Sequence, residues 1–456
     1  MKSIIKKYLR LADVDRAVFF GVSGTLWQAV SAPATMFMIG WFMTGEVQGF
    51  HYTFYSLVAI QSFFELGLYV VVLYVASHEW THLQINKNGC IEGEPKALSR
   101  LVSLGRFIFK WYGVASILFI LCVGIAGHFF LSQESYPGID WEGPWWALIV
   151  LSGFSLWALP FNSLLEGCDQ VANIQKFRLG QMILRSLGMW FALAMGWGLW
   201  ASVVAVAAAV FRDVYLFGVE YRNFFRPFFS LKVDSSIDWK TEIWPMQSRL
   251  ALGGIFSYFL FAAFVPVMFH FHGPILAGQM GMTLSVVALL QGLAGKWIHP
   301  KRPQFGMLIA KKDYKQLDQV WFRTLRITVL VAVVCAGVSC LGIYLLNVMN
   351  ISLAERMLPP LPSSIFIVTT IFMAAAICQT AYLRAHKKEP LLGLSIVTSL
   401  IMGILTLVLG SRFGALGAAV AYLIVMGFIS LPWETFIWFR CRAEWHRADA
   451  NVLEAT

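Results

Sequence analysis

The chain has 456 residues, of which 58% are hydrophobic and only 13% are charged. Soluble globular domains carry about 25% charged residues, so this composition excludes an ordinary soluble enzyme or binding domain. The formal net charge of +10 would suit a nucleic-acid-binding protein, but the placement of the basic residues explains it differently, as shown below.

Apolar stretches follow one another along the whole chain, each long enough to cross a hydrocarbon core of about 30 Å. In lipid each must be helical, because every backbone donor and acceptor needs a partner within the segment. The first stretch is too long for a signal peptide and lacks a small-residue cleavage site. We therefore expect an all-α polytopic membrane protein with twelve spans, at 17–43, 52–77, 111–131, 144–165, 179–197, 199–219, 250–271, 274–295, 327–349, 361–383, 391–411 and 413–439.

Basic residues set the expected orientation. Because the number of spans is even, both termini lie on one side of the membrane. All 35 lysines and arginines except Arg356 and Arg412 fall in tails, loops and span ends on that side. Positive residues favour the cytoplasm, so both termini are predicted to be cytoplasmic. The net charge is then a topology signal; membrane lipids, and no nucleic acid, are the expected partners.

The second span ends in the sequence HEWTH, which fits the H-E-x-x-H pattern of zinc proteases. A catalytic zinc needs a third protein ligand, for which Glu166 and Asp169 are conceivable donors. The chain lacks a downstream Asp-Gly motif, and its second half carries no counterpart. We expect His78 and His82 to be an interfacial pair that binds no metal. No other catalytic or nucleotide motif is present, so no cofactor and no enzyme activity are expected; an intramembrane metalloprotease is the alternative from another class.

The two halves of the chain show a faint duplication. Matching residues recur in order, at offsets that drift only as loops change length, beginning with Gly49, Ser56, Val58 and Ala59 against Gly278, Ser285, Val287 and Ala288. Two halves of six spans have the same orientation and are related by a pseudo-two-fold axis along the membrane normal. This predicts a six-helix lobe at 1–225, a cytoplasmic linker at 226–248, and a second lobe with a basic tail at 249–456; chance similarity is the alternative.

Several segments resemble a known group. FYSLVAIQSFFELGLYVVVLY resembles the second helix of polysaccharide and oligosaccharidyl-lipid flippases of the multidrug/oligosaccharidyl-lipid/polysaccharide exporter superfamily, and Glu65 with Gly67 matches the acidic residue and glycine that interrupt it. LPFNSLLEGCDQVANIQKFRLGQMI is similar to the connection between helices four and five, KKDYKQLDQVWFRTLRITV to the lead-in to helix nine, and SRFGALGAAVAYLI to the eleven–twelve turn.

This resemblance implies two six-helix bundles around a central cavity that opens to either face in turn. For the O-antigen and exopolysaccharide branch it implies flipping of an oligosaccharide on undecaprenyl pyrophosphate across the bacterial inner membrane, in partnership with polysaccharide polymerase machinery. Drug exporters of the superfamily also have twelve spans. A cation-coupled exporter of small amphiphiles is therefore the alternative.

Charged residues within the spans are candidates for function, because intramembrane charge costs at least a few kcal/mol. They are Glu65, Arg185, Arg212, Asp213 and Glu434. We predict that Arg185 and Arg212, with Arg249 at the start of the seventh span, form a basic vestibule that binds pyrophosphate through bidentate guanidinium contacts.

The carboxylates have a different predicted role. Glu65 and Asp213 are expected to balance an arginine or to carry a coupling ion, H+ or Na+. The structural alternative is that both arginines reach the inner headgroups and that Arg212 pairs locally with Asp213 or Glu65. Glu434 is close to the inner surface, and we expect it to be interfacial.

Overall fold

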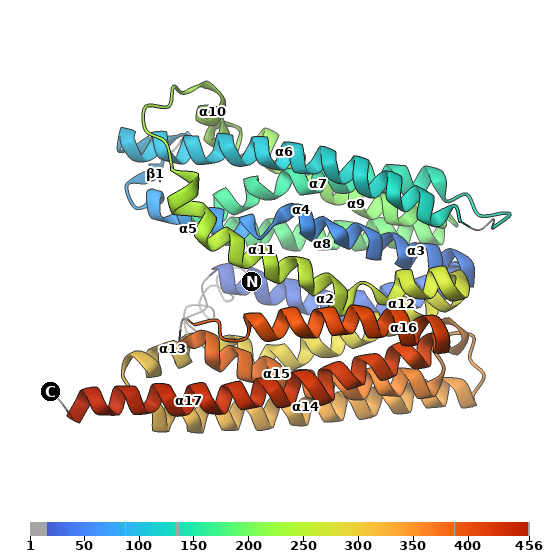
Figure 1. Cartoon of the computed structure of the whole chain (residues 1–456). Helices are drawn as coiled ribbons and strands as arrows, with labels where there is room; N and C mark the ends of the chain where they lie inside the picture. Colours follow the sequence, from blue (N-terminus) through green and yellow to red (C-terminus); the bar gives the residue numbers. More distant parts are fainter. Residues whose placement is uncertain (1–15, 87, 134–135, 387, 455–456) are drawn as a thin grey trace, which may run out of the picture. The chain divides into compact units, whose positions relative to one another are not determined.

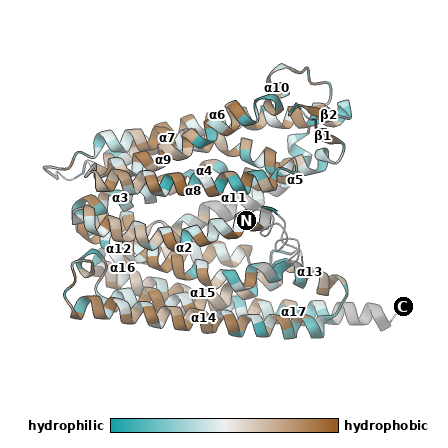
Figure 2. Cartoon of the chain, turned by 180° about the vertical axis from the view of Figure 1, so that it is seen from behind, coloured by the Kyte–Doolittle hydropathy of each residue, from teal (hydrophilic) through white to brown (hydrophobic). Residues whose placement is uncertain are grey.

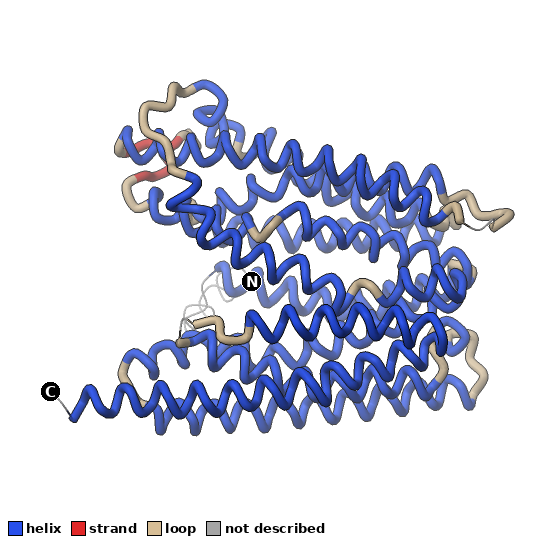
Figure 3. Tube along the Cα trace, in the orientation of Figure 1, coloured by secondary structure: helices blue, strands red, loops and turns tan. Residues whose placement is uncertain are grey.

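The computed structural model describes residues 16–454 of the chain except 87, 134–135 and 387 (Figure 1). Apart from one short hairpin, β1 (Leu83–Ile85) and β2 (Ile91–Gly93), the regular structure of the described part is helical (Figure 3). The chain divides into two compact units, one of residues 1–43 and 57–255 and one of residues 44–56 and 256–456. The lobe boundaries expected from the sequence stay a prediction.

In the first unit, α7 is the central helix. It packs against α5, α6 and α9, while α8 packs against α2 and α9. The helices of this unit are α2 (Arg16–Phe42), α4 (Ser62–Glu65), α5 (Leu68–Trp80), α6 (Pro95–Leu131), α7 (Glu142–Gly167), α8 (Val171–Ala194), α9 (Trp200–Tyr215), α10 (Arg222–Ser230) and most of α11 (Trp244–Phe261), with short helical turns at Ala59–Gln61, Leu216–Glu220 and Trp239–Ile243.

In the second unit, α12 and α15 are central. α12 packs against α14, α15 and α16, and α15 packs against α14, α16 and α17. The helices are α3 (Gly45–Val58), α12 (Phe264–Ile298), α13 (Arg302–Ala310), α14 (Tyr314–Val348), α15 (Pro360–Ala385), α16 (Leu392–Leu423) and α17 (Leu431–Glu454), with short turns at His299–Lys301, Ala354–Arg356 and Ile424–Ser430.

The predicted spans are largely helical in the structure. α12 and α16 each contain parts of two predicted spans, which meet at a kink. The kink in α12 is at Gly273 (φ 82°), and that in α16 is at Gly414 (φ 58°). In the described part, seven helices are long and apolar enough to cross a membrane, or eight if the broken pair Gly45–Glu65 and Leu68–Trp80 is one span. The predicted all-α polytopic architecture is confirmed; the cytoplasmic placement of the termini stays a prediction.

Hydrophilic residues gather around β1, β2 and α10, while the long helices are largely apolar (Figure 2). The second unit has an aromatic core cluster in which Trp321 of α14 stacks on Trp438 of α17 at 4.5 Å between ring centroids. The indole N–H of Trp321 donates to the Cys378 carbonyl of α15 at 2.9 Å. Three helices are thereby joined at one end of this unit.

The glycines behind the duplication have a packing role. A Cβ on Gly49 would lie 2.0 Å from the Pro274 carbonyl oxygen, and one on Gly278 would lie 2.9 Å from the Gly49 nitrogen. The two glycines that the repeat equates therefore contact each other where α3 meets α12. Gln48 secures this contact, because its amide donates to the Gly278 carbonyl at 2.9 Å.

Candidate functional site

The second predicted span is broken next to its only carboxylate. α4 ends at Glu65, Leu66 and Gly67 adopt left-handed conformations (φ 52° and 67°), and α5 begins at Leu68. Glycine adopts this conformation freely, whereas a leucine there costs roughly 1–2 kcal/mol. Non-helical backbone at membrane depth is tolerated where protein buries it or where it lines a water-filled cavity. The break therefore marks this segment as a candidate site.

Glu65 is half-buried beside this break, and its carboxylate makes no hydrogen bond or ion pair with any residue that the structure describes. The adjacent Phe64 packs edge-on against Phe119 of α6 at 5.7 Å. Tyr112 of α6 is fully buried and interacts electrostatically with Glu65. A carboxylate so placed is available to a proton, a cation or a cationic group of a ligand.

One turn further along α5, an ion pair joins three helices. Arg178 of α8 pairs with Glu166 at the end of α7, Nη1 to Oε1, at 2.9 Å. The Tyr69 hydroxyl of α5 donates to the other Glu166 oxygen at 2.5 Å and accepts a hydrogen bond from Arg178. The Glu166 side chain is only 7% exposed, so its charge depends on these partners.

Asp213 of α9 is 4% exposed and is held by neutral amides. Gln181 of α8 donates to Oδ2 at 3.1 Å, and Asn162 of α7 lies 3.5 Å from Oδ1. The Gln181 amide also donates to the Ala209 carbonyl at 3.0 Å. Asp213 is therefore a buried carboxylate without a direct basic partner among the described side chains.

The neighbouring Arg212 turns away from Asp213. Its guanidinium lies 4.6 Å from the Phe177 ring centroid of α8, and Nη2 is 3.4 Å from the Phe177 carbonyl. A Cβ on Gly180 would come within 2.7 Å of Nη2, so glycine leaves room for this group. Among the described residues, Arg212 forms no ion pair with Asp213 or Glu65. Its position suits a cation–π contact that joins α8 and α9.

The remaining predicted site residues are placed as follows. Arg185 is exposed on α8, seven residues after Arg178 and therefore on nearly the same helix face. Arg249 lies in α11, but its side chain is outside the described part of the chain. The structure thus gathers Asp213 and Arg212 around the α7–α8–α9 contact, with Arg185 one turn beyond Gln181.

Two features escaped the sequence analysis. α8 begins at Val171, eight residues before the predicted span, so Arg178 is two turns inside a helix and not in a loop. A glutamate that ends one helix and an arginine two turns into the next would have signalled this pair. Glu434, expected to be interfacial, is 5% exposed in the second unit and accepts a hydrogen bond from Thr380 at 2.6 Å.

The HEWTH segment lies at the end of α5. Its Glu79 is paired with Arg100 at 2.8 Å, and Arg100 also contacts Glu242 at 2.6 Å. His82 lies 3.7 Å from Glu94, and both side chains are more than half exposed. No group of three His, Cys, Asp or Glu side chains in the described part is arranged to hold a metal ion. Glu79, which a metalloprotease would use as general base, therefore forms an ion pair with Arg100 in this structure.

No protein-family model and no curated protein matches this sequence. A multidrug resistance MATE family transporter of the MOP superfamily, in an inward-facing conformation, is similar with a TM-score of 0.57 and 10% identity over 90% of this chain and 98% of that one. Lipid II flippase MurJ, in an inward closed conformation, is similar with a TM-score of 0.58 and 12% identity, over 92% of this chain and 87% of that one. The MATE multidrug transporter DinF-BH is similar with a TM-score of 0.56 and 12% identity, over 94% of this chain and 95% of that one. The chain therefore has the two-bundle fold of MOP-superfamily transporters, as the sequence predicted.

Proposed function

We propose that the protein is a transporter that flips an undecaprenyl-pyrophosphate-linked oligosaccharide from the inner to the outer leaflet of the bacterial inner membrane, by alternating access. The observation that carries the proposal is Arg185, an exposed guanidinium group inside the predicted α8 span. Guanidinium groups match phosphate oxygens bidentately. The fold shared with lipid II flippase MurJ supports a lipid-linked cargo.

The three arginines have different parts in this proposal. Arg178 is neutralised by Glu166 and maintains the α5–α7–α8 contact. Arg212 is half-buried against Phe177 and holds α8 on α9. Arg185 is the exposed one, so it is the residue that we assign to the incoming pyrophosphate. Polysaccharide polymerase machinery would consume the product on the other leaflet.

The test uses a strain that lacks the protein and accumulates lipid-linked oligosaccharide on its inner leaflet. Wild-type protein should relieve the accumulation, and Arg185→Ala should not, although it is inserted at normal levels. Arg185→Lys should recover part of the transport, because an ammonium keeps the charge but loses the bidentate geometry. Arg440→Ala, which removes an exposed and paired arginine from α17, is the matched control. Normal transport by Arg185→Ala would contradict the assignment.

A second candidate is a cation-coupled exporter of small amphiphiles. Glu65 favours it, because its carboxylate lies beside the broken helix without a hydrogen bond or ion pair to any described residue. Asp213, which is held by amides, favours it as well. Proteoliposomes separate the two candidates. Export of an organic cation that requires a proton or sodium gradient and is lost in Glu65→Gln, without any movement of lipid-linked sugar, would establish the exporter.

A further inference from the structure

α14 is longer than its membrane span requires. Its apolar part, from Ile327 to Val348, measures about 32 Å at 1.5 Å per residue, which matches a hydrocarbon core of about 30 Å. The preceding turns, 314–326, contain Lys315, Arg323 and Arg326. These turns therefore lie at the depth of the lipid headgroups and beyond.

One face of α14 is turned towards lipid. Only 17% of its most apolar window is buried, against 61% for α7. The exposed apolar side chains include Leu330, Val333, Val334, Leu341, Tyr344 and Val348. At about 100° per residue these positions share one arc of the helix, and the three basic residues fall on the same arc. The face that contacts acyl chains thus continues as a basic stripe at the membrane surface.

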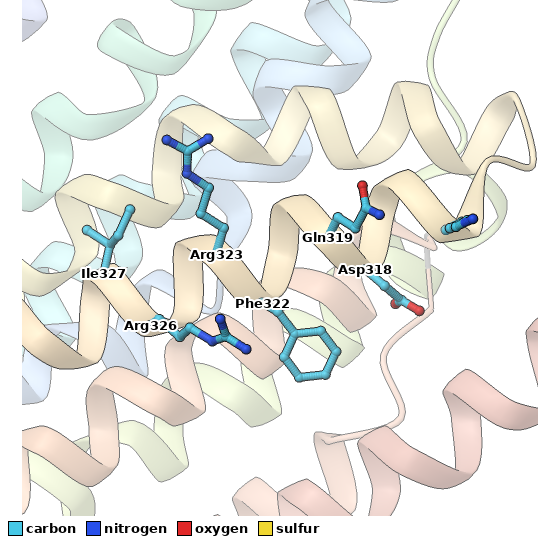
Figure 4. A pocket seen from close by; sticks show the side chains of 7 residues that line it. Asp318, Gln319, Phe322, Arg323, Arg326 and Ile327 are labelled. Atoms are coloured by element: carbon cyan, nitrogen blue, oxygen red, sulfur yellow. The ribbon is translucent and has the colours of Figure 1, made fainter.

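A groove of about 670 Å³ follows this stripe between Lys315 and Ile327. Figure 4 shows Arg323 and Ile327 on one side of the helix and Phe322 with Arg326 on the other. Phe322 is 39% exposed and lies beside Arg326 (Figure 4), so it adds apolar surface next to that guanidinium group. The groove combines positive charge with an apolar surface at its membrane end.

The cations of the groove are not neutralised by the protein. Lys315, Arg323 and Arg326 form no hydrogen bond or ion pair with any described residue. The acidic residue of the groove, Asp318, is bound by Arg442 of α17, with Nε to Oδ1 at 3.1 Å. The groove therefore has a net positive charge that an anion can satisfy.

Other arginines at the same end of this unit differ in this respect. Arg384 pairs with Glu389 at 3.0 Å, and Arg440 pairs with Glu444 at 2.9 Å. Both side chains are exposed, so exposure alone does not leave a cation without a partner. Arg323, Arg326 and Lys315 differ from these two arginines, because none of the three has an acidic partner among the described residues.

We propose that Arg323, Arg326 and Lys315 bind the phosphate of an anionic phospholipid in the leaflet at this end of α14. The two guanidinium groups contact the phosphate, Lys315 extends the positive surface beyond it, and the acyl chains lie along the exposed apolar face from Ile327 onwards. A membrane phospholipid is the ligand, because the stripe continues a lipid-facing surface. The site is independent of the proposed cargo.

Native mass spectrometry of the purified full chain with short-chain phosphatidylglycerol or phosphatidylcholine tests this site. Wild-type protein should bind phosphatidylglycerol more tightly. Each basic residue near an anionic lipid contributes about fivefold in binding, so R323Q/R326Q should weaken phosphatidylglycerol binding by about 25-fold. Binding of phosphatidylcholine should not change. The matched control, R384Q/R440Q, removes the same charge from paired arginines and should keep the wild-type preference.

Three outcomes would overturn the proposal. The first is that R323Q/R326Q retains the wild-type preference for phosphatidylglycerol. The second is that R384Q/R440Q loses this preference to the same extent, which would mean a general charge effect. The third is that inorganic pyrophosphate displaces the lipid at equal concentration, which would mean that free phosphate is the ligand. If R323Q/R326Q is not monodisperse, R323K/R326K keeps the charges and should still weaken binding several-fold through loss of the bidentate contacts; unchanged binding in that variant would also overturn it.

Discussion

The first unit has buried charged side chains where its helices pack, whereas the ion pairs of the second unit are more exposed. In the first, Asp213 lies where α7, α8 and α9 meet. The Glu166–Arg178 pair lies where α5, α7 and α8 meet. In the second, Arg442 pairs with Asp318, and the pair Arg384–Glu389 is exposed. Buried charges between packed helices depend on specific partners, so a ligand or a proton can change the packing there.

The interior of the second unit contains an aromatic cluster. Trp321, Tyr382 and Trp438 pack within 5.6 Å of one another between centroids. Glu434, held by Thr380, is a buried carboxylate in this otherwise aromatic and aliphatic region. Apolar packing is not directional, and large rings fix the helix positions by shape. The first unit also has an aromatic cluster, around Phe109, Phe161 and Phe225, so the difference between the units lies in their buried charges.

The largest expected effect tests the aromatic interior of the second unit. Trp321→Ala should destabilise the protein by about 3–5 kcal/mol, because it leaves a cavity and removes the indole donor of the Cys378 carbonyl. Thermal unfolding of the purified protein measures this. Trp433→Ala, at a tryptophan that is 45% exposed on α17, is the control and should change little. Equal losses in the two variants would show that the cluster does not stabilise the unit.

Glu166→Gln tests the ion pair of the first unit. It removes the partner of Arg178 and should cost about 2–3 kcal/mol, less than a fully buried pair because Arg178 is a third exposed. The double variant Glu166→Gln/Arg178→Gln should recover much of that loss, since it leaves no uncompensated charge. Glu389→Gln, which breaks the exposed pair of the second unit, should cost less than about 1 kcal/mol. If Glu166→Gln is as mild as Glu389→Gln, the two units do not differ in this way.

Asp213→Asn separates charge from packing. Asn162 has its side-chain oxygen buried without a hydrogen-bond partner in the described structure, so its amide can turn and accept from the new asparagine. The free energy of unfolding should therefore change by less than about 1 kcal/mol. Transport in the deletion strain should fall strongly if the carboxylate carries a coupling ion. Normal transport at normal stability would assign Asp213 a packing role only.

The sequence predicted the helices well, because a long apolar stretch without charge has one stable arrangement in lipid. Span ends were less certain. α8 and α14 continue past their apolar parts as amphipathic turns, where hydropathy no longer marks the helix. In α8 that continuation contains Arg178, whose place in a helix was missed. In α14 it matches the lead-in to helix nine that the family resemblance implied.

Side-chain pairing was the least predictable property. Arg212 precedes Asp213 in the chain, yet successive helical residues point about 100° apart, so neither is the natural partner of the other. Tertiary packing gives Arg212 an aromatic ring and gives Asp213 two amides. The break at Leu66 and Gly67 was indicated only by a glycine and by the family resemblance, since the flanking residues are as apolar as those of an unbroken span.

The smallest expected effect concerns an ion pair at the end of the first unit. Burial raises the pKa of Glu242, but the Asp238 backbone N–H at 3.0 Å and the Arg100 guanidinium outweigh it, so this pKa is lowered from its ordinary value of 4.5. The folded state therefore binds this proton less readily than the unfolded chain. The resulting stability is present above about pH 4.5 and is lost as the pH falls through the lowered value.

Glu242→Gln should therefore lower stability by less than about 1 kcal/mol at pH 7, because the carboxylate is partly exposed and screened. The difference between variant and wild type should shrink as the pH falls from 7 to 3, because the carboxylate becomes protonated as the pH passes through the lowered pKa. Unfolding curves at pH 7 and pH 3 measure it. If the difference is as large at pH 3 as at pH 7, the contribution of Glu242 is one of packing, and the comparison of the two units by their ion pairs would not extend to this end of the first unit.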